Sequence, residues 1–285
     1  MGNKKNIVLI GSRVYVIEEL LKDKEFINLS IYALKNSFLE TYSNEKGLVF
    51  KTFSMDKKQK CLDELLALNF DVLISNGCPI LFPVNRFGSN QILINVHPTY
   101  LPHLQGKTPM NGVFYLDYDF YGATMHYIDN GVDTGDIIYQ QKEELTNDID
   151  LGLLYHLAMS MEGVVFIKGW KKLKEADFKN IGIKQLEKGT YFNRTITMQT
   201  LNFEEDNTVN LLRKIKSFGV DTQGCIAKIE LKNYKIFEAE VIIHIPLLKK
   251  FENAKPGELV LNYDGNFLIK TIDGLLKIKK YELII

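Results

Sequence analysis

The stretch INVHPTYLPHLQGKTP, residues 94–109, joins the end of an apolar run to a loop that three prolines stiffen. The run at 92–96 is short and continuous, which predicts a strand buried on both faces of a sheet. Asn95 and His97 stand at the carboxyl end of that strand. Ligands of parallel sheets bind beyond the carboxyl ends of the strands, so the stretch predicts a site as well as a strand.

The same pattern extends along the chain on both sides of this stretch. Further strands are expected at 6–10, 29–33, 48–53, 71–75, 123–128 and 137–141, and helices at 16–21, 61–68 and 151–173. Short apolar strands that alternate with helices are typical of a parallel sheet with crossover helices. The sequence therefore predicts an α/β fold: a Rossmann-like, mainly parallel sheet with flanking helices.

The pattern changes near residue 185. KGTYF at 188–192 is typical of a linker, a helix is expected at 209–218, and short alternating strands follow. Asp264-Gly265 and Asp273-Gly274 predict hairpin turns between these strands. Together they favour a small C-terminal β-barrel, OB-like in form. We therefore predict two domains, a catalytic α/β domain at 1–187 and the β domain at 188–285.

The amino-acid composition limits the classes of function that this protein can have. The 285 residues carry 35 basic and 35 acidic side chains, a formal net charge of zero. A protein whose main task is to grip nucleic acid needs clustered cations, so a nucleic-acid partner is disfavoured. The three cysteines have neither disulfide nor C-x-x-C metal spacing. We find no signal peptide and no apolar run near 18 residues, and therefore expect a cytoplasmic protein.

Asn95, His97 and Asp133 supply the chemical groups that acyl transfer needs. Singly, each has an ordinary structural interpretation: a strand-end cap, a packed ring and a turn residue. In combination, a carboxamide can donate to the oxyanion of a tetrahedral intermediate, an imidazole can move the amine proton, and a carboxylate can orient the imidazole. A G-x-S-x-G elbow is absent from the sequence, which favours direct transfer without a covalent enzyme intermediate.

One family signature runs through about 45 residues. It reads N-V-H-P-x-x-L-P from Asn95, a proline at Pro109, and then G-A-T-x-H-x-x-D-x-G-V-D-T-G-D-I-I from Gly122. This order resembles the folate-dependent formyltransferase family, which includes glycinamide ribonucleotide, methionyl-tRNA and sugar-nucleotide N-formyltransferases. The KGTYF linker and the closing PGELVLNYDGNFLIKTIDGLLKIKKYEL are similar to the small C-terminal barrel of the tRNA and sugar enzymes.

The resemblance implies a site and a co-substrate. It implies that Asn95, His97 and Asp133 form a catalytic triad, and that the formyl donor is 10-formyltetrahydrofolate. Residues implied to contact the folate are Cys78, Pro79, Ile80, Leu81, Phe82, Leu93, Ile128 and Asp129. Residues implied to contact the acceptor are Tyr100, Lys107 and His126. Many relatives carry an arginine where this chain has Gln105-Gly106-Lys107, so Lys107 would replace it as a point charge rather than a fork.

The acceptor remains open within the family. A second domain weighs against a glycinamide ribonucleotide enzyme, and the compact YSNEKGLVFKTF at 42–53 replaces the longer basic insert of the tRNA enzymes. We therefore favour a nucleotide-linked amino deoxysugar as acceptor and partner, in a chain that could form a homodimer. Methionyl-tRNA formyltransferase, 10-formyltetrahydrofolate hydrolase and a non-catalytic binding module are the alternatives.

Two other uses of the polar residues are disfavoured. His97, His126, Asp129, Asp133 and Asp136 could gather around a metal, but spacings such as H-E-x-x-H are absent. We therefore predict no metal. The loop at Gly11-Ser12-Arg13 could bind an anion at a helix start, but it lacks G-x-G-x-x-G spacing, which favours a tight turn and predicts no nicotinamide cofactor.

Overall fold

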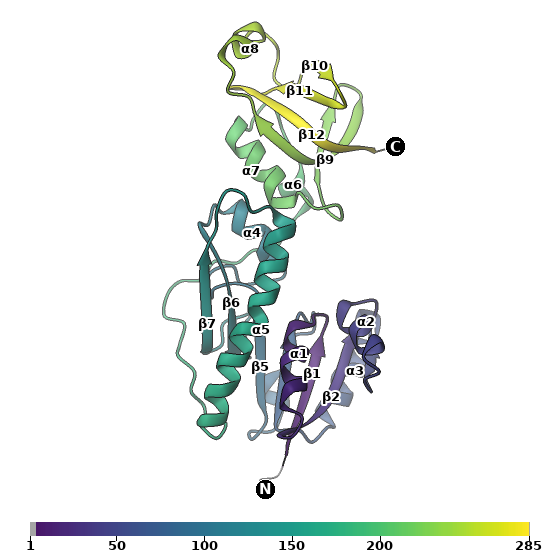
Figure 1. Cartoon of the computed structure of the whole chain (residues 1–285), viewed down its shortest axis with the longest axis vertical. Coiled ribbons are helices and arrows are strands. Elements are labelled where there is room, and N and C mark those ends of the chain that lie inside the picture. Colours follow the sequence, from purple (N-terminus) through teal and green to yellow (C-terminus); the bar gives the residue numbers. More distant parts are fainter. Residues whose placement is uncertain (1–3, 285) are drawn as a thin grey trace. The chain divides into compact units, whose positions relative to one another are not determined.

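The structure is a computed structural model that describes residues 4–284 (Figure 1). Its Cα positions group into two compact units. The first runs to Pro109 and adds Tyr121–Glu144 and His156–Tyr191, and the second takes Met110–Phe120, Leu145–Tyr155 and the chain from Phe192. The domain boundary at residue 187 stays a prediction, since the second unit is built from three segments of the chain.

The first unit contains a seven-stranded sheet with helices around it. Its strands are β1 (Lys5–Gly11), β2 (Ile27–Leu34), β3 (Lys51–Phe53), β4 (Val72–Asn76), β5 (Ile92–His97), β6 (Phe120–Tyr127) and β7 (Ile137–Glu144). Its helical segments are α1 (Tyr15–Leu20), η1 (Leu21–Asp23), α2 (Phe38–Glu45), η2 (Met55–Lys57), α3 (Lys58–Leu66), η3 (Val84–Arg86) and most of α5 (Leu151–Glu175).

The strand order of this sheet is β3-β2-β1-β4-β5-β6-β7. The ladders from β3 to β5 are parallel, and β6 pairs with β5 in the antiparallel sense. The predicted Rossmann-like, mainly parallel sheet is confirmed. The strand expected at 48–53 is shorter and begins at Lys51, while Leu48 and Phe50 pack against the core ahead of it.

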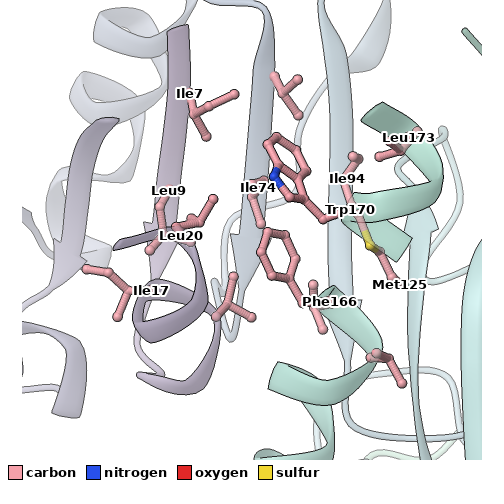
Figure 2. Close-up of a cluster of buried hydrophobic side chains, with 14 of the residues drawn as sticks. Ile7, Leu9, Ile17, Leu20, Ile74, Ile94, Met125, Phe166, Trp170 and Leu173 are labelled. Atoms are coloured by element: carbon pink, nitrogen blue, oxygen red, sulfur yellow. The ribbon is translucent and has the colours of Figure 1, made fainter. Parts of the chain in front are cut away.

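Successive strand residues feed two separate cores, one on each face of the sheet. On β1, Ile7 and Leu9 face one cluster, whereas Val8 and Ile10 face the other. Figure 2 shows the first cluster, where α1 and α5 cover the sheet and the rings of Phe166 and Trp170 stack with centroids 5.5 Å apart. The second cluster lies between the sheet, α3 and the loop after β4.

This alternation decides which polar residues reach the site. On β5, Ile94 and Val96 belong to the first cluster, and Leu93 belongs to the second. Because side chains two residues apart share a face, Asn95 and His97 point to the same face as Leu93. The strand order reverses between β1 and β4, which places the ligand crevice of such a sheet at their carboxyl ends.

Helix α5 meets the length and apolar composition of a membrane-spanning helix, although the sequence predicts no apolar run that is long enough to cross a membrane. In this fold Val165, Phe166 and Leu173 on α5 are fully or almost fully buried in the first core cluster. Core helices pass the same compositional test. The helix is therefore explained by its place against the sheet.

The second unit is built on a five-stranded antiparallel sheet in the order β10-β11-β12-β9-β8. Its strands are β8 (Cys225–Ile229), β9 (Lys232–Val241), β10 (Leu259–Tyr263), β11 (Asn266–Lys270) and β12 (Leu275–Ile284), and its helices are α4 (Pro109–Tyr115), α6 (Ile196–Gln199), α7 (Thr208–Phe218) and α8 (Ile245–Lys250).

Helix α7 and the hairpins of this sheet follow the predicted pattern. The Asn207 side chain caps α7 by accepting the N–H of Asn210, and Leu211, Ile215 and Phe218 enter the core of the unit. Asp264 and Gly265 both have positive φ between β10 and β11, the geometry of a type I′ turn. The small C-terminal β domain is confirmed.

Candidate active site

Asp133 is the centre of a polar cluster at the carboxyl end of β5. Its Oδ1 accepts the Asn95 Nδ2–H at 3.2 Å, and its Oδ2 accepts the Gly106 N–H at 3.0 Å. The Nδ1 of His97 lies 3.6 Å from Oδ2, and the Nε2 of His126 lies 3.6 Å from Oδ1. The carboxyl group thus joins the two residues predicted as its catalytic partners.

The turn that carries Asp133 is fixed by its own chain and by two glutamines. Asp133 has φ of 57°, which aspartate tolerates better than most residues. Gly135 has its Cα so close to the Tyr127 carbonyl oxygen that an added Cβ would lie 1.8 Å from it. The amides of Gln105 and Gln185 donate to the Asp133 carbonyl at 3.2 and 3.0 Å. The close contact between the turn and the Tyr127 carbonyl therefore requires a glycine at position 135, and the two glutamines hold the turn in place.

His97 is buried between two acceptors. Its Nε2 donates to the Leu104 carbonyl at 3.0 Å, so in the neutral ring Nδ1 carries the lone pair and faces Asp133. Burial lowers the pKa of His97 below its ordinary value, although Asp133 and the Leu104 carbonyl oppose that shift. The ring is thus poised to take a proton at Nδ1, where the Asp133 carboxylate would stabilise it.

The pKa of Asp133 is lowered, although burial by itself would raise it. The neighbouring His97 and His126 rings and the Gly106 N–H outweigh burial and hold the pKa well below the usual range of a carboxyl. Asp133 is therefore ionised throughout the neutral pH range.

Two cavities meet at this cluster. One, of 490 Å³, is lined by Asn95, His97 and Asp133. The other, of 120 Å³, shares Asn95 and Asp133 and is also lined by His126. The three predicted catalytic residues therefore border one cavity, and two of them border both.

The predicted folate-contacting residues gather mainly around the smaller cavity, which is lined by Cys78, Ile80, Leu81, Phe82, Ile128 and Asp129. Pro79 lines the larger cavity. Leu93 lies beneath them, buried in the cluster that contains Ile80 and Phe82. Leu81 is 72% exposed, so its apolar side chain lies open at the cavity.

The predicted acceptor-side residues are more dispersed. Lys107 is exposed and lines the larger cavity. His126 is 2% exposed and lies directly across the β5–β6 ladder from Asn95. Tyr100 lines neither cavity, and its ring lies 5.2 Å from the Lys142 ammonium instead. The structure therefore brings Lys107 and His126 to the site, but not Tyr100.

Arg13 and Glu162 form a buried ion pair at the edge of the site. Arg13 lines the larger cavity, and its side chain is 19% exposed, whereas the Glu162 side chain is 0% exposed. Burial raises the pKa of Glu162, and Arg13 and Asn76 oppose that shift. The sequence marks Arg13 only as part of a loop and Gln105 only as a departure from the family pattern, and nothing in it marks Glu162 or Gln185.

The residues around the cavities do not favour a reactive cysteine or a metal site. Burial raises the pKa of the Cys78 thiol to about 12, so it stays protonated and weakly nucleophilic at neutral pH. Among residues 4–284, no group of three or more His, Cys, Asp or Glu side chains has an arrangement that could hold a metal ion.

The position of His97 leads to a pH prediction. Its imidazole should titrate with a midpoint below the ordinary 6.5, and Asp133→Asn should lower that midpoint further, because the variant removes the main group that favours the imidazolium. NMR titration of the ring resonances measures both midpoints, with His97→Ala used to assign the signal. A midpoint above 6.5, or an upward shift in Asp133→Asn, would contradict this account.

Comparison with known proteins shows which family the chain resembles. A family model described as formyl transferase matches residues 30–168, and one described as formyl transferase, C-terminal domain, matches residues 195–284. Methionyl-tRNA formyltransferase of Caldanaerobacter subterraneus subsp. tengcongensis is 27% identical over 244 residues, which cover 84% of this chain and 75% of that protein.

Two solved structures share the fold. An N-formyltransferase from Helicobacter canadensis, in complex with folinic acid and dTDP-3-aminofucose, superposes with a TM-score of 0.71 at 20% identity, covering 98% of this chain and 100% of that one. HypX from Aquifex aeolicus, in complex with tetrahydrofolic acid, gives a TM-score of 0.66 at 15% identity. This chain spans 44% of the length of HypX, and the match covers 97% of this chain. With both parts matched by family models, the chain belongs to the formyl transferase family.

Proposed function

We propose that this protein transfers a formyl group from 10-formyltetrahydrofolate to the primary amine of a nucleotide-linked amino deoxysugar. The observation that carries the proposal is the convergence of Asn95, His97 and Asp133 on one cavity of 490 Å³. A carboxamide, a buried imidazole and an ionised carboxylate at one cavity are the groups that acyl transfer to an amine needs.

The surroundings of the smaller cavity support the folate as formyl donor. Ile80, Phe82 and Ile128 give apolar walls, and Leu81 leaves exposed apolar surface at the opening. The flat face of a pterin ring suits such walls. The donor is a co-substrate, and it supplies a formyl group bonded to a nitrogen that can leave.

The reaction then follows from the chemistry of these groups. The amine nitrogen attacks the formyl carbon, a new C–N bond forms, and the carbonyl electron pair moves onto oxygen. The tetrahedral intermediate collapses as the donor C–N bond breaks. His97 takes the amine proton at Nδ1 beside Asp133 and returns it to the leaving nitrogen, so that tetrahydrofolate and an N-formylamino sugar are released.

Two cations at the larger cavity favour an acceptor that carries phosphate. Lys107 and Arg13, whose guanidinium also pairs with Glu162, both line this cavity with the predicted catalytic residues. Guanidinium and ammonium groups are the usual protein partners of phosphate oxygens. The pyrophosphate of a nucleotide-linked sugar would meet both cations while its amine lies near His97.

The pairing of basic residues in the second unit weighs against a large nucleic-acid partner. Lys277 and Lys279 both pair with Glu240, and Lys280 pairs with Asp221. Paired lysines on a chain of zero net charge give a weak positive potential. This favours a small nucleotide over tRNA.

A methionyl-tRNA acceptor is the second candidate, because the relative with 27% identity carries that name. It predicts formylation of charged initiator tRNA with an affinity that falls steeply as salt rises. A nucleotide-linked sugar predicts a weaker salt dependence, since its two phosphates release fewer counterions.

One assay separates the candidates. The protein is incubated with 10-formyltetrahydrofolate and, in parallel, dTDP-linked 3-amino and 4-amino deoxysugars, charged initiator tRNA, or buffer alone, and the appearance of tetrahydrofolate is followed. We expect fast turnover with at least one amino sugar. Turnover with tRNA alone would replace the proposed acceptor, and formate release that is equally fast in buffer would identify a hydrolase.

A further inference from the structure

The side-chain amide of Asn95 has only one orientation that is compatible with the hydrogen-bonding groups around it. Asn95 on β5 and His126 on β6 are partners in the antiparallel ladder, on adjacent strands in Figure 1. The Nδ2 of Asn95 lies 3.1 Å from the His126 Nε2 and 3.2 Å from the Asp133 Oδ1. An ionised carboxylate oxygen can only accept a hydrogen bond, so the question is which role His126 plays.

The tautomer of His126 answers this question. Its Nδ1 lies 2.8 Å from the Tyr127 carbonyl oxygen, which can only accept. The neutral ring therefore carries its hydrogen on Nδ1, and its Nε2 accepts. Both neighbours of the amide are acceptors, and the two N–H groups of Nδ2 satisfy them. A flipped amide would set its oxygen against two acceptors and lose both hydrogen bonds.

The free polar atom of Asn95 is consequently its oxygen. Among residues 4–284, the hydrogen bonds to this side chain all involve Nδ2. In this part of the chain, the buried polar side-chain atoms without a hydrogen-bond partner belong to Ser43, Asn76 and Glu162. The Asn95 Oδ1 is not among these buried atoms. Since Asn95 lines both cavities, its Oδ1 is open to them as an acceptor.

We propose that His126 is a positioning residue that fixes Asn95 with Oδ1 toward the cavity, and that Oδ1 accepts an N–H of the attacking amine. This differs from the role predicted from residue types, in which the carboxamide donates to the formyl oxygen. The inference rests on the proposed function for the class of acceptor, a primary amine. Such an amine offers one N–H to Asn95 and passes another proton to His97 as its lone pair attacks.

The two roles of Asn95 predict different kinetics. A donor to the oxyanion would serve attack by amine and attack by water alike, because both pass through a tetrahedral intermediate. A side chain that accepts a hydrogen bond from the amine helps to bind and orient that amine. Water as the nucleophile does not need to be bound in this way. Asn95→Ala should therefore lower formyl transfer about 100-fold, as misplacement of a reactant does, while hydrolysis of 10-formyltetrahydrofolate stays within about threefold of the native rate.

Replacement of His126 tests the positioning step. The Gln side chain can place an acceptor oxygen near the position of Nε2, whereas Leu cannot. His126→Leu should lower transfer about tenfold through loss of one amide hydrogen bond and leave hydrolysis unchanged. His126→Gln should stay within about threefold of the native protein in both reactions. The exposed His156 gives the matched control, His156→Leu, with both rates native.

The experiment measures transfer and hydrolysis under single turnover, with far-ultraviolet circular dichroism and folate binding to show that each variant is folded. Equal losses of transfer and hydrolysis in Asn95→Ala, or the same loss in His126→Gln as in His126→Leu, would overturn the inference. If no amino sugar is formylated, the proposed function fails, and the same comparison is made with whichever amine is formylated. If no amine at all is formylated, both proposals fall.

Discussion

His97→Ala should lower kcat by about 10²–10⁴-fold and leave folate binding almost unchanged. Such a loss is typical when a general acid–base group is removed. His97 is the imidazole whose Nδ1 faces the Asp133 carboxylate at 3.6 Å while its Nε2 is held by the Leu104 carbonyl. Most of the predicted folate contacts lie around the smaller cavity, and His97 does not line that cavity. The affinity for the folate donor should therefore not depend on the imidazole ring. Steady-state kinetics and calorimetric titration with folinic acid measure the two quantities.

The matched control for this prediction is His156→Ala. His156 is exposed on α5, where its Nδ1 lies 3.3 Å from the Tyr15 hydroxyl, and it lines neither cavity. Its removal should leave kcat native. Near-native turnover in His97→Ala would remove the imidazole from the mechanism, and a parallel loss of folate affinity would show that the variant damages the donor site instead.

The sequence predicts the strand ends well because strand periodicity is a local property. The apolar run before Asn95 requires β5, and the two-residue period places Asn95 and His97 on one face. The same logic explains Ser75, the last but one residue of β4, which shares the face of Leu73 and lines the smaller cavity. Asp133 has no such local signal. Its place at the site rests on the family signature and on a turn that closes onto Tyr127.

The contacts that hold the site together could not be predicted, because they join segments far apart in sequence. Gln185 reaches the Asp133 carbonyl across 52 positions, and Arg13 reaches Glu162 across 149. No pattern within a window of the sequence reports such pairs. The stretch predicted as a linker also contributes, since Thr190 accepts the Leu104 N–H and so fixes the loop beside His97.

Helix α2 has a local signal in the sequence that does not depend on its apolar pattern. The apolar pattern does not predict this helix, but Ser37 and Glu40 have the spacing of a capping box. In the structure the Glu40 N–H donates to the Ser37 hydroxyl at 3.3 Å, and the Glu40 carboxylate accepts the N–H of Asn36. The apolar pattern of this short helix is weak, with Leu39 as its one buried apolar side chain. Capping chemistry was therefore the better guide to this helix.

Arg13→Ala should reduce the free energy of unfolding by about 3–5 kcal/mol, the range found when one partner of a buried ion pair is removed. The Glu162 side chain is 0% exposed, and its Oε2 already lacks a hydrogen-bond partner. Without the guanidinium, the carboxylate would be a buried charge with no counter-ion. Urea unfolding followed by circular dichroism at neutral pH measures the loss.

The pH dependence of that loss identifies its cause. Burial raises the pKa of Glu162 above its ordinary 4.5, and Arg13 opposes this shift, so Arg13→Ala raises the pKa of Glu162 further. The folded variant then keeps a proton that the unfolded chain releases, and its stability falls as pH rises above about 4.5. The difference from the native protein should accordingly be larger at pH 8 than at pH 5.

Two further variants separate the ion pair from simple loss of a side chain. Arg86→Ala removes an exposed arginine that lies 3.7 Å from Asp63, and it should change stability by less than about 1 kcal/mol. Arg13→Met combined with Glu162→Leu removes both charges and fills their volume, so it should recover most of the lost stability. If the double variant is as unstable as Arg13→Ala at every pH, the packing of the Arg13 stem against Gly77, rather than an uncompensated Glu162 charge, accounts for the effect.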